Sequence, residues 1–140
     1  MKLSKSSEYA IRLVCWLALN SREKYVPLSE IAEELQLSFY QLTKVAQRLI
    51  RDGLIKSYTG PNGGVELTKP PNEISLLDIL RSNNEVAFVD RCILGLEECG
   101  GENPCALHDY WASVKENMLD MFDVNIAMLT TDSDGLVDRR

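Results

Sequence analysis

The sequence lacks the features that identify membrane-spanning, secreted and catalytic proteins. No apolar run is long enough to cross a bilayer, and the first residues pass into an amphipathic pattern without a secretory signal. There is no Cys-x-x-Cys pair, phosphate-binding loop, Ser-His-Asp set or paired-carboxylate set. We therefore expect a cytoplasmic protein that is not an enzyme and has no membrane partner. In such a reducing compartment its cysteines stay free of structural disulfides.

Histidine is scarce, and cysteine is unevenly placed. The single histidine, His108, follows three of the four cysteines, Cys92, Cys99 and Cys105, at short spacing. Three thiolates and one imidazole suit zinc or an iron-sulfur cluster better than calcium or magnesium, and the spacing does not separate the first two. The alternative is a set of redox-active or structural thiols. Cys15 differs, because its apolar neighbours predict a position in the core.

The loop between these cysteines is rich in glycine. Gly95, Gly100 and Gly101 allow the backbone to bend until three sulfurs approach one point. The proline before Cys105 lies where a helix can start, which would leave Cys105 and His108 one turn apart on the same helical face.

Charge divides the 140-residue chain into two unlike halves. The net charge is −6, but residues 1–71 hold ten Lys or Arg against seven Asp or Glu, whereas residues 72–140 hold five against fourteen. Length and composition are those of a globular protein with one core or two small subdomains. Only the first half is therefore suited to approach a polyanion.

The first half reads as three helices followed by a hairpin. Apolar spacing predicts helices over about 4–20 and 28–35, and Ser38 with Gln41 forms a capping-box pattern that opens a third helix, ended by Gly53. Two short strands, 54–58 and 65–67, flank a glycine-rich turn. This arrangement is typical of a winged helix-turn-helix, whose second helix enters the major groove. The alternative is a solvated helix in an unrelated three-helix domain.

Several short motifs together resemble one known family. They are Leu3-Ser4, Tyr9-Ala10, Ile31-Ala32-Glu33, Leu42-Thr43-Lys44, Arg51-Asp-Gly-Leu54 and Gly60-Pro-Asn-Gly-Gly64, followed by the three cysteines. With them, the chain resembles the Rrf-two family of bacterial winged-helix regulators over about residues 1 to 130. The best-known branches of that family are the iron-sulfur assembly regulator and the nitric-oxide-sensing repressor.

The resemblance implies a homodimeric transcription regulator, a repressor or dual regulator, that binds a palindromic double-stranded DNA operator. It implies that redox state or nitric oxide acts through an iron-sulfur cluster, with 2Fe-2S favoured and 4Fe-4S as the alternative. By the same resemblance, Cys92, Cys99 and Cys105 are cluster ligands. The remaining ligand is His108, or Glu8 from the partner subunit. For Glu8 the alternative is an exposed carboxylate favoured by the helix dipole.

The winged helix-turn-helix pattern gives candidate DNA-binding residues, whose base contacts are argued from chemistry because Tyr40-Gln41 departs from the usual family pair. They are Ser38, Tyr40, Gln41, Thr43, Lys44, Gln47, Arg48, Tyr58, Thr59, Gly60, Pro61, Asn62 and Gly63. Amides among them can pair with adenine, cations can reach guanine or phosphate, and Tyr40 or Thr43 can touch a thymine methyl group. Thr59 stands where many relatives have an arginine, and six residues separate Cys92 from Cys99 where five or fewer is usual. Neither the operator sequence nor the cluster type therefore transfers directly.

The second half is expected to supply the dimer. Ser75 can cap a short helix over 76–81, and the pattern over 106–129 predicts one long helix. The heptad seam of that helix is Leu107, Trp111, Val114, Met118, Met121, Asn125 and Met128. Asn125 would fix the register across a dimer seam, and the alternative is packing within one subunit.

The expected fold class is mainly α with a small β wing, a winged helix-turn-helix domain plus a long dimerisation helix. Its parts are 1–71 (DNA-binding domain), 72–91 (short helix and connection), 92–108 (cluster-binding loop), 105–130 (dimerisation helix) and 131–140 (flexible tail). A zinc-stabilised regulator, a regulator without a cluster, and a thiol or iron-sulfur carrier enzyme are the competing functions.

Overall fold

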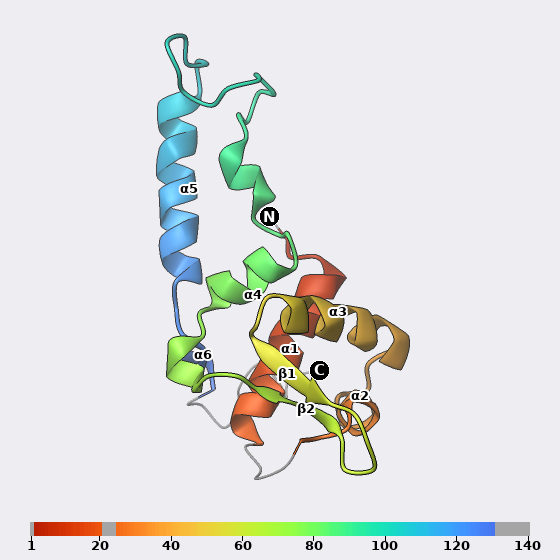
Figure 1. The fold of residues 1–140 in the computed structure, drawn as a ribbon. Coiled ribbons are helices and arrows are strands. Elements are labelled where there is room, and N and C mark those ends of the chain that lie inside the picture. The colour runs from red at the N-terminus through yellow and green to blue at the C-terminus, as the bar shows by residue number, and fades with distance from the viewer. Residues whose placement is uncertain (1, 21–24, 131–140) are drawn as a thin grey trace.

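The computed structural model describes residues 2–20 and 25–130 (Figure 1). The elements in these ranges are α1 (Lys5–Leu19), α2 (Leu28–Leu35), α3 (Phe39–Arg51), β1 (Ile55–Tyr58), β2 (Gly64–Leu67), the 3-10 helix η1 (Pro71–Glu73), α4 (Leu76–Ser82), the 3-10 helix η2 (Ala87–Asp90), α5 (His108–Phe122) and α6 (Ile126–Leu129). The expected fold class is confirmed. The tail predicted at 131–140 lies outside the described residues, as do residues 21–24.

Local signals define the helices of the winged domain. The Ser4 hydroxyl accepts the Ser7 N–H at the start of α1, and the Ser38 hydroxyl accepts the Gln41 N–H at the start of α3. The turn between α2 and α3 is made by Gln36 in the left-handed region. Gly53, with φ of 75°, follows the end of α3, as its sequence position predicts.

The wing is an antiparallel pair in which Ile55 lies opposite Leu67 and Tyr58 opposite Gly64. A bridge attaches it to the chain before α2, because the Val26 N–H donates to the Val65 carbonyl (3.1 Å) and the Val65 N–H to the Val26 carbonyl (2.8 Å). A Cβ on Gly64 would overlap the Val26 carbonyl, so this close approach requires glycine. The bridge fixes the wing relative to the helices.

The hydrophobic core begins on α1 and continues into the second half of the chain. Leu13, Val14 and Trp16 of α1 are buried together with Leu42 and Leu49 of α3. The same cluster includes side chains of the later elements, namely Ile74, Ile79, Leu80, Phe122 and Ile126. The winged domain therefore shares its core with α4 and with the end of α5.

The helix predicted over 106–129 is interrupted, and this part of the prediction is wrong. Helix α5 ends at Phe122, and Asn125 caps α6 by accepting the Met128 N–H (3.0 Å). The Leu76 N–H donates to the Val124 carbonyl (2.8 Å), so the break is held against α4. Asn125 therefore acts as a helix cap, which its short polar side chain favours, and does not continue the heptad seam.

Helix α5 also begins later than predicted. Its first residue is His108, so Cys105 precedes the helix, and the two are joined by a turn in which the His108 N–H donates to the Cys105 carbonyl (3.1 Å). From there α5 runs beside η2 and extends away from the winged domain (Figure 1). None of the helices in the described parts of the chain has the length and hydropathy to span a membrane.

Candidate cysteine centre and DNA-binding surface

Three cysteines and the histidine gather at the end of α5 that is remote from the winged domain. Cys92 follows η2 and is buried, while Cys99 and Cys105 lie half-buried in the loop before α5. His108 is the first residue of α5. The structure thus brings the predicted ligands to one region, although they are separated along the chain by a glycine-rich loop.

One contact in this region joins Cys99 to His108. The Cys99 Sγ lies 3.7 Å from the His108 Nδ1. The Lys115 ammonium, about two turns beyond His108 on α5, donates to the same sulfur (3.6 Å) and to the Val89 carbonyl of η2 (2.9 Å). Lys115 therefore links the Cys99 sulfur to η2.

A second contact joins Cys92 to Cys105. Backbone N–H groups of Leu96 and Leu94 donate to the Cys92 sulfur and hold the pKa of this thiol below its ordinary value. Burial, followed by the hydrogen bond and the charge of Cys92, raises the pKa of Cys105. Peptide N–H groups directed at a thiolate are a feature of iron-sulfur sites, where they tune the cluster.

The donors approach one another pairwise, and a complete coordination shell is not formed. Within residues 2–20 and 25–130, no three His, Cys, Asp or Glu side chains form a group that could hold a metal ion. All four cysteines are free thiols. The residue types fit zinc or iron-sulfur ligation, and a glycine-rich loop must close further to bring them to one centre. Glu8 lies in the first turn of α1.

Cys15 behaves as the sequence predicts. Its side chain is fully buried in α1, and burial raises the pKa of its thiol to about 12. A thiol that remains protonated is neither a good nucleophile nor a metal ligand. Cys15 is therefore a buried core thiol with which the three cysteines near α5 can be compared.

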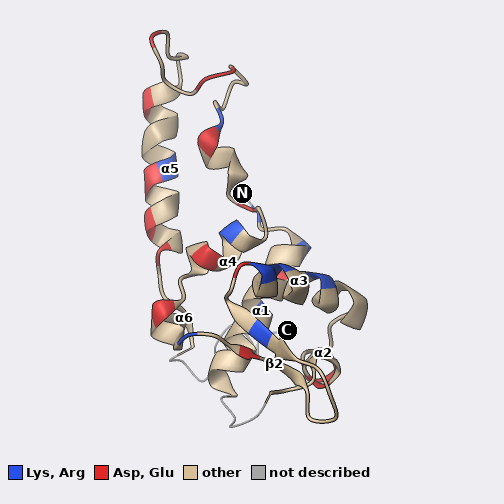
Figure 2. Ribbon diagram, viewed as in Figure 1, with Lys and Arg blue, Asp and Glu red and all other residues tan. Residues whose placement is uncertain are grey.

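Helix α3 carries Lys and Arg residues (Figure 2). Tyr40, Gln41, Lys44 and Gln47 are exposed. The Lys44 ammonium lies 4.5 Å from the centre of the Tyr40 ring, so these two side chains form one cationic and aromatic unit. The Thr43 hydroxyl donates to the Phe39 carbonyl (2.8 Å) of its own helix. Most of the polar residues predicted to contact DNA thus lie on an accessible face.

The wing presents a second accessible surface. Residues 59–62 are exposed at its tip. Tyr58 stacks on Tyr25 with ring centres 5.5 Å apart, and Lys56 pairs with Glu66 across the strands (3.0 Å). A Cβ on Gly63 would overlap the Tyr58 carbonyl. The tip is therefore compact, which allows peptide groups to approach a DNA backbone.

Arg48, a predicted DNA contact, is held by side chains from distant parts of the chain. Its Nη1 donates to the Ser6 hydroxyl (2.9 Å) and to the Asn83 side-chain oxygen (2.6 Å).

The sequence did not single out three residues that make contacts at these sites, namely Asn83, Glu85 and Lys115. Their contacts span distant positions and leave no local pattern.

Comparison with known proteins agrees with this architecture. Residues 3–132 match the Rrf2 family, described as "Iron-dependent Transcriptional regulator". The HTH-type transcriptional regulator IscR of Serratia proteamaculans is 32% identical over 138 residues, which cover 98% of this chain and 84% of that protein.

Two solved structures extend the comparison. CymR, the global cysteine regulator of B. subtilis, superposes with a TM-score of 0.75 at 26% identity, covering 94% of this chain and 97% of that chain. T. potens IscR gives a TM-score of 0.71 at 27% identity, covering 91% of this chain and 84% of that chain. The relatives are named as regulators and not as enzymes. The chain therefore belongs to the Rrf2 family and is a DNA-binding helix-turn-helix transcriptional regulator of the IscR type.

Proposed function

We propose that this protein is a homodimeric regulator whose affinity for its operator is controlled by an iron-sulfur cluster. The cluster ligands are Cys92, Cys99, Cys105 and His108, and a 2Fe-2S cluster is favoured over 4Fe-4S. When bound, such a cluster supplies one-electron redox chemistry and reactivity toward oxygen or nitric oxide. The chain supplies the ligands, the hydrogen bonds to sulfur and the DNA-binding surface.

The gathering of the three free thiols and the single histidine around one end of α5 carries this proposal. The Cys99 to His108 distance is 3.7 Å, and peptide N–H groups already favour the Cys92 thiolate. A glycine loop between them can close without side-chain obstruction at Gly95, where a Cβ would meet nothing within 4 Å. Glu8 of the partner subunit is the alternative for the last ligand, and it would link the cluster to the winged domain.

The operator surface is formed by α3 and the wing. Ser38, which caps α3, and the exposed tip residues 59–62 contact phosphates in this proposal. Tyr40, Gln41, Lys44 and Gln47 are directed toward base edges, because they lie on the exposed face of the recognition helix. The Asp and Glu residues of α5 belong to a helix that extends away from α3 and the wing (Figure 2).

Helix α5 supports a dimer because it exposes apolar side chains. Val114 is 47% exposed and Met121 is 60% exposed. Among the described residues of α5, only Phe122 is buried. Trp111 and Met118 are half-buried, and Met128 is exposed on α6. A second copy of α5 would cover this face and place two recognition helices on successive half-sites.

Anaerobic purification tests the cluster. The unsubstituted protein should be coloured and contain equal amounts of iron and sulfide, whereas Cys105→Ala should lose most of both and its visible absorption. Cys15→Ala is the matched control, because Cys15 is a fully buried core thiol, and it should retain the cluster. Zinc in colourless protein would indicate the zinc-stabilised alternative, and equal iron in Cys105→Ala would contradict the ligand assignment.

A regulator without a cluster is the second candidate, and one observation favours it. The fold is similar to CymR of B. subtilis, described as a global cysteine regulator, and to CymR of Staphylococcus aureus, which has been solved in an oxidised form. This candidate predicts that Cys99→Ala binds operator DNA as the unsubstituted anaerobic protein does. The cluster proposal predicts that Cys99→Ala binds only as the cluster-free protein does.

A further inference from the structure

We propose that Asn83 and Glu85 couple the cysteine loop to the recognition helix through a polar network, which we call the Asn83–Glu85 bridge. The bridge comprises these two residues and their partners Ser4, Ser6, Ser7 and Arg48. This inference rests on the proposed function, since it assigns the path by which the state of the cysteine loop alters DNA affinity.

Glu85 fastens the end of α4 to the start of α1. Its Oε1 accepts the Ser4 N–H (2.9 Å), and its Oε2 accepts the hydroxyls of Ser4 (2.7 Å) and Ser7 (2.7 Å). Both carboxylate oxygens are thus engaged by the first turn of α1. A displacement of Glu85 must break these bonds or move the N-terminus of α1 with it.

Asn83 extends the network to α3. Its amide nitrogen donates to the Ser7 hydroxyl (2.7 Å), and its oxygen accepts the Ser6 hydroxyl (2.9 Å) and the Arg48 guanidinium (2.6 Å). The backbone nearby is joined as well, because the Ser82 hydroxyl donates to the Arg48 carbonyl (3.2 Å). Asn83 therefore holds the head group of Arg48, a residue on the recognition helix.

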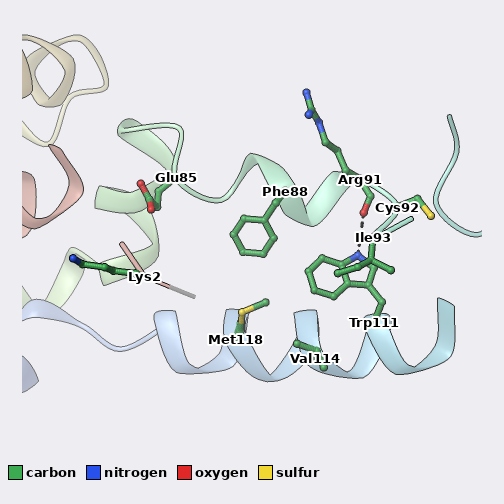
Figure 3. A pocket seen from close by; sticks show the side chains of 9 residues that line it. All are labelled: Lys2, Glu85, Phe88, Arg91, Cys92, Ile93, Trp111, Val114 and Met118. Carbon is green, nitrogen blue, oxygen red and sulfur yellow. Dashed lines mark hydrogen bonds between the residues drawn. The ribbon is translucent and has the colours of Figure 1, made fainter. Parts of the chain in front are cut away.

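The other end of the path is attached to the cysteine region. The Trp111 Nε1 donates to the Arg91 carbonyl (3.0 Å), directly before Cys92 (Figure 3). Lys115 donates to both the Val89 carbonyl (2.9 Å) and the Cys99 sulfur (3.6 Å). The segment η2 is therefore connected through side chains of α5 to the loop that would hold a cluster.

The chain between the two ends is short and constrained. It runs from Glu85 through the buried Val86 and η2 to Cys92. The preceding residue, Asn84, adopts φ of 56°, and the Glu85 N–H donates to the Leu80 carbonyl (2.9 Å), which fixes the end of α4. Because this connection is short and constrained, a displacement of Cys92 also displaces Glu85.

Space for such a movement is present. Glu85 and Cys92 both line a groove of about 570 Å³ between η2 and α5, together with Phe88 and Trp111 (Figure 3). The rings of Phe88 and Trp111 lie 6.0 Å apart at their centres. Because η2 contacts α5 through one aromatic pair and two side-chain hydrogen bonds, it can shift when the cysteine loop closes. Two sites joined by such a network can then influence one another.

The test compares operator affinity in two states of each protein, anaerobically reconstituted and cluster-free. The ratio of the two dissociation constants measures the coupling, and iron and sulfide content are measured in parallel. The variants are Asn83→Ala and Glu85→Gln, the second of which keeps its shape but turns one acceptor oxygen into a donor. Asp78→Asn is the matched control, because Asp78 is a carboxylate of α4 that accepts the Ser75 N–H (3.0 Å) outside the network.

The expected result is a coupling ratio reduced at least about threefold in Asn83→Ala and Glu85→Gln, with unchanged iron content, and a normal ratio in Asp78→Asn. A bridge that only stabilises the fold would lower the melting temperature and leave the ratio unchanged, and that outcome would overturn this inference. If the unsubstituted protein binds the operator equally well with and without its cluster, that result would instead overturn the proposed function, and the inference with it.

Discussion

At the residue scale, the negative charge of Glu85 strengthens the hydrogen bonds that Ser4 and Ser7 donate to it. Burial opposes its ionisation, but the hydroxyls of Ser4 and Ser7 and the Ser4 N–H donate to the carboxylate and bring its pKa below the ordinary value of 4.5. A carboxyl whose pKa is depressed by folding stabilises the folded state above its unfolded pKa. That contribution is lost as the pH falls through the depressed value.

We therefore predict that Glu85→Gln lowers the melting temperature by about 2–5 °C at about pH 7, since it weakens hydrogen bonds to a partly exposed charge. The difference from the unsubstituted protein should shrink as the pH falls below 4.5 and the native carboxyl takes up a proton. Calorimetry across this range measures it. Glu73→Gln, on the exposed η1, should show no comparable difference at any pH.

The cysteines show how far residue-level reasoning extends. Residue type and spacing made Cys92, Cys99, Cys105 and His108 candidate ligands, and the structure brings them into pairs. Apolar neighbours identified Cys15 as a core residue. The lysine that contacts Cys99 was missed, because Lys115 lies 16 positions away and no sequence pattern marks the pair.

At the element scale, helix α3 is the part of the molecule best suited to DNA. Its cations include Lys44, which is exposed and lies against Tyr40. Each phosphate neutralised by a lysine releases bound counterions, so operator affinity should fall with salt concentration. The number of such contacts sets the steepness of that fall.

Replacing Lys44 by Ala should reduce the slope of log affinity against log salt by about one for each subunit bound. Titration of operator DNA at several salt concentrations measures this slope. Lys69→Ala removes the same charge outside the predicted DNA surface and should leave the slope unchanged. Equal slopes for Lys44→Ala and the unsubstituted protein would exclude Lys44 as a phosphate contact.

The elements that local signals specify were predicted well. Ser38 and Ser75 cap helices where the sequence predicts caps, and the wing falls within one residue of its predicted bounds. The long C-terminal helix was predicted wrongly because its apolar spacing continues through 123–125. There Asn125 caps a new turn and Ile126 is drawn into the core, so tertiary packing overrides the helical pattern.

At the scale of the whole molecule, the exposed apolar face of α5 would form the interface of the proposed dimer. A charge in the centre of a symmetric apolar seam meets its own copy, so repulsion and desolvation both oppose association. Val114 occupies such a position, whereas Ser113 is exposed on a different face of α5.

Val114→Glu should weaken the dimer at least about tenfold, which corresponds to about 1.4 kcal/mol, and Ser113→Glu should leave it unchanged. Sedimentation equilibrium over a range of protein concentrations measures the dissociation constant. A monomeric unsubstituted protein would contradict the dimer proposal. Operator binding by Val114→Glu should fall in parallel, since two half-sites are no longer bound together.

The polar network that joins α1, α3 and α4 could not be read from the sequence. Ser7 and Glu85 are 78 positions apart, and Arg48 and Asn83 are 35 apart. Each residue alone is an ordinary polar side chain, and only the packing of α4 against α1 brings them together. Spacing and periodicity report contacts within an element, and this part of the molecule lies between elements.

The corner after α5 has a mechanical consequence. The 15-residue helix is about 22 Å long, and Phe122 and Ile126 anchor its lower end in the core. A rotation of about 10° around this anchor moves the opposite end by about 4 Å for a rod of that length. A displacement of the cysteine loop at the start of α5 by a few ångströms would therefore correspond to a rotation of only about 10° at the end that packs beside α4.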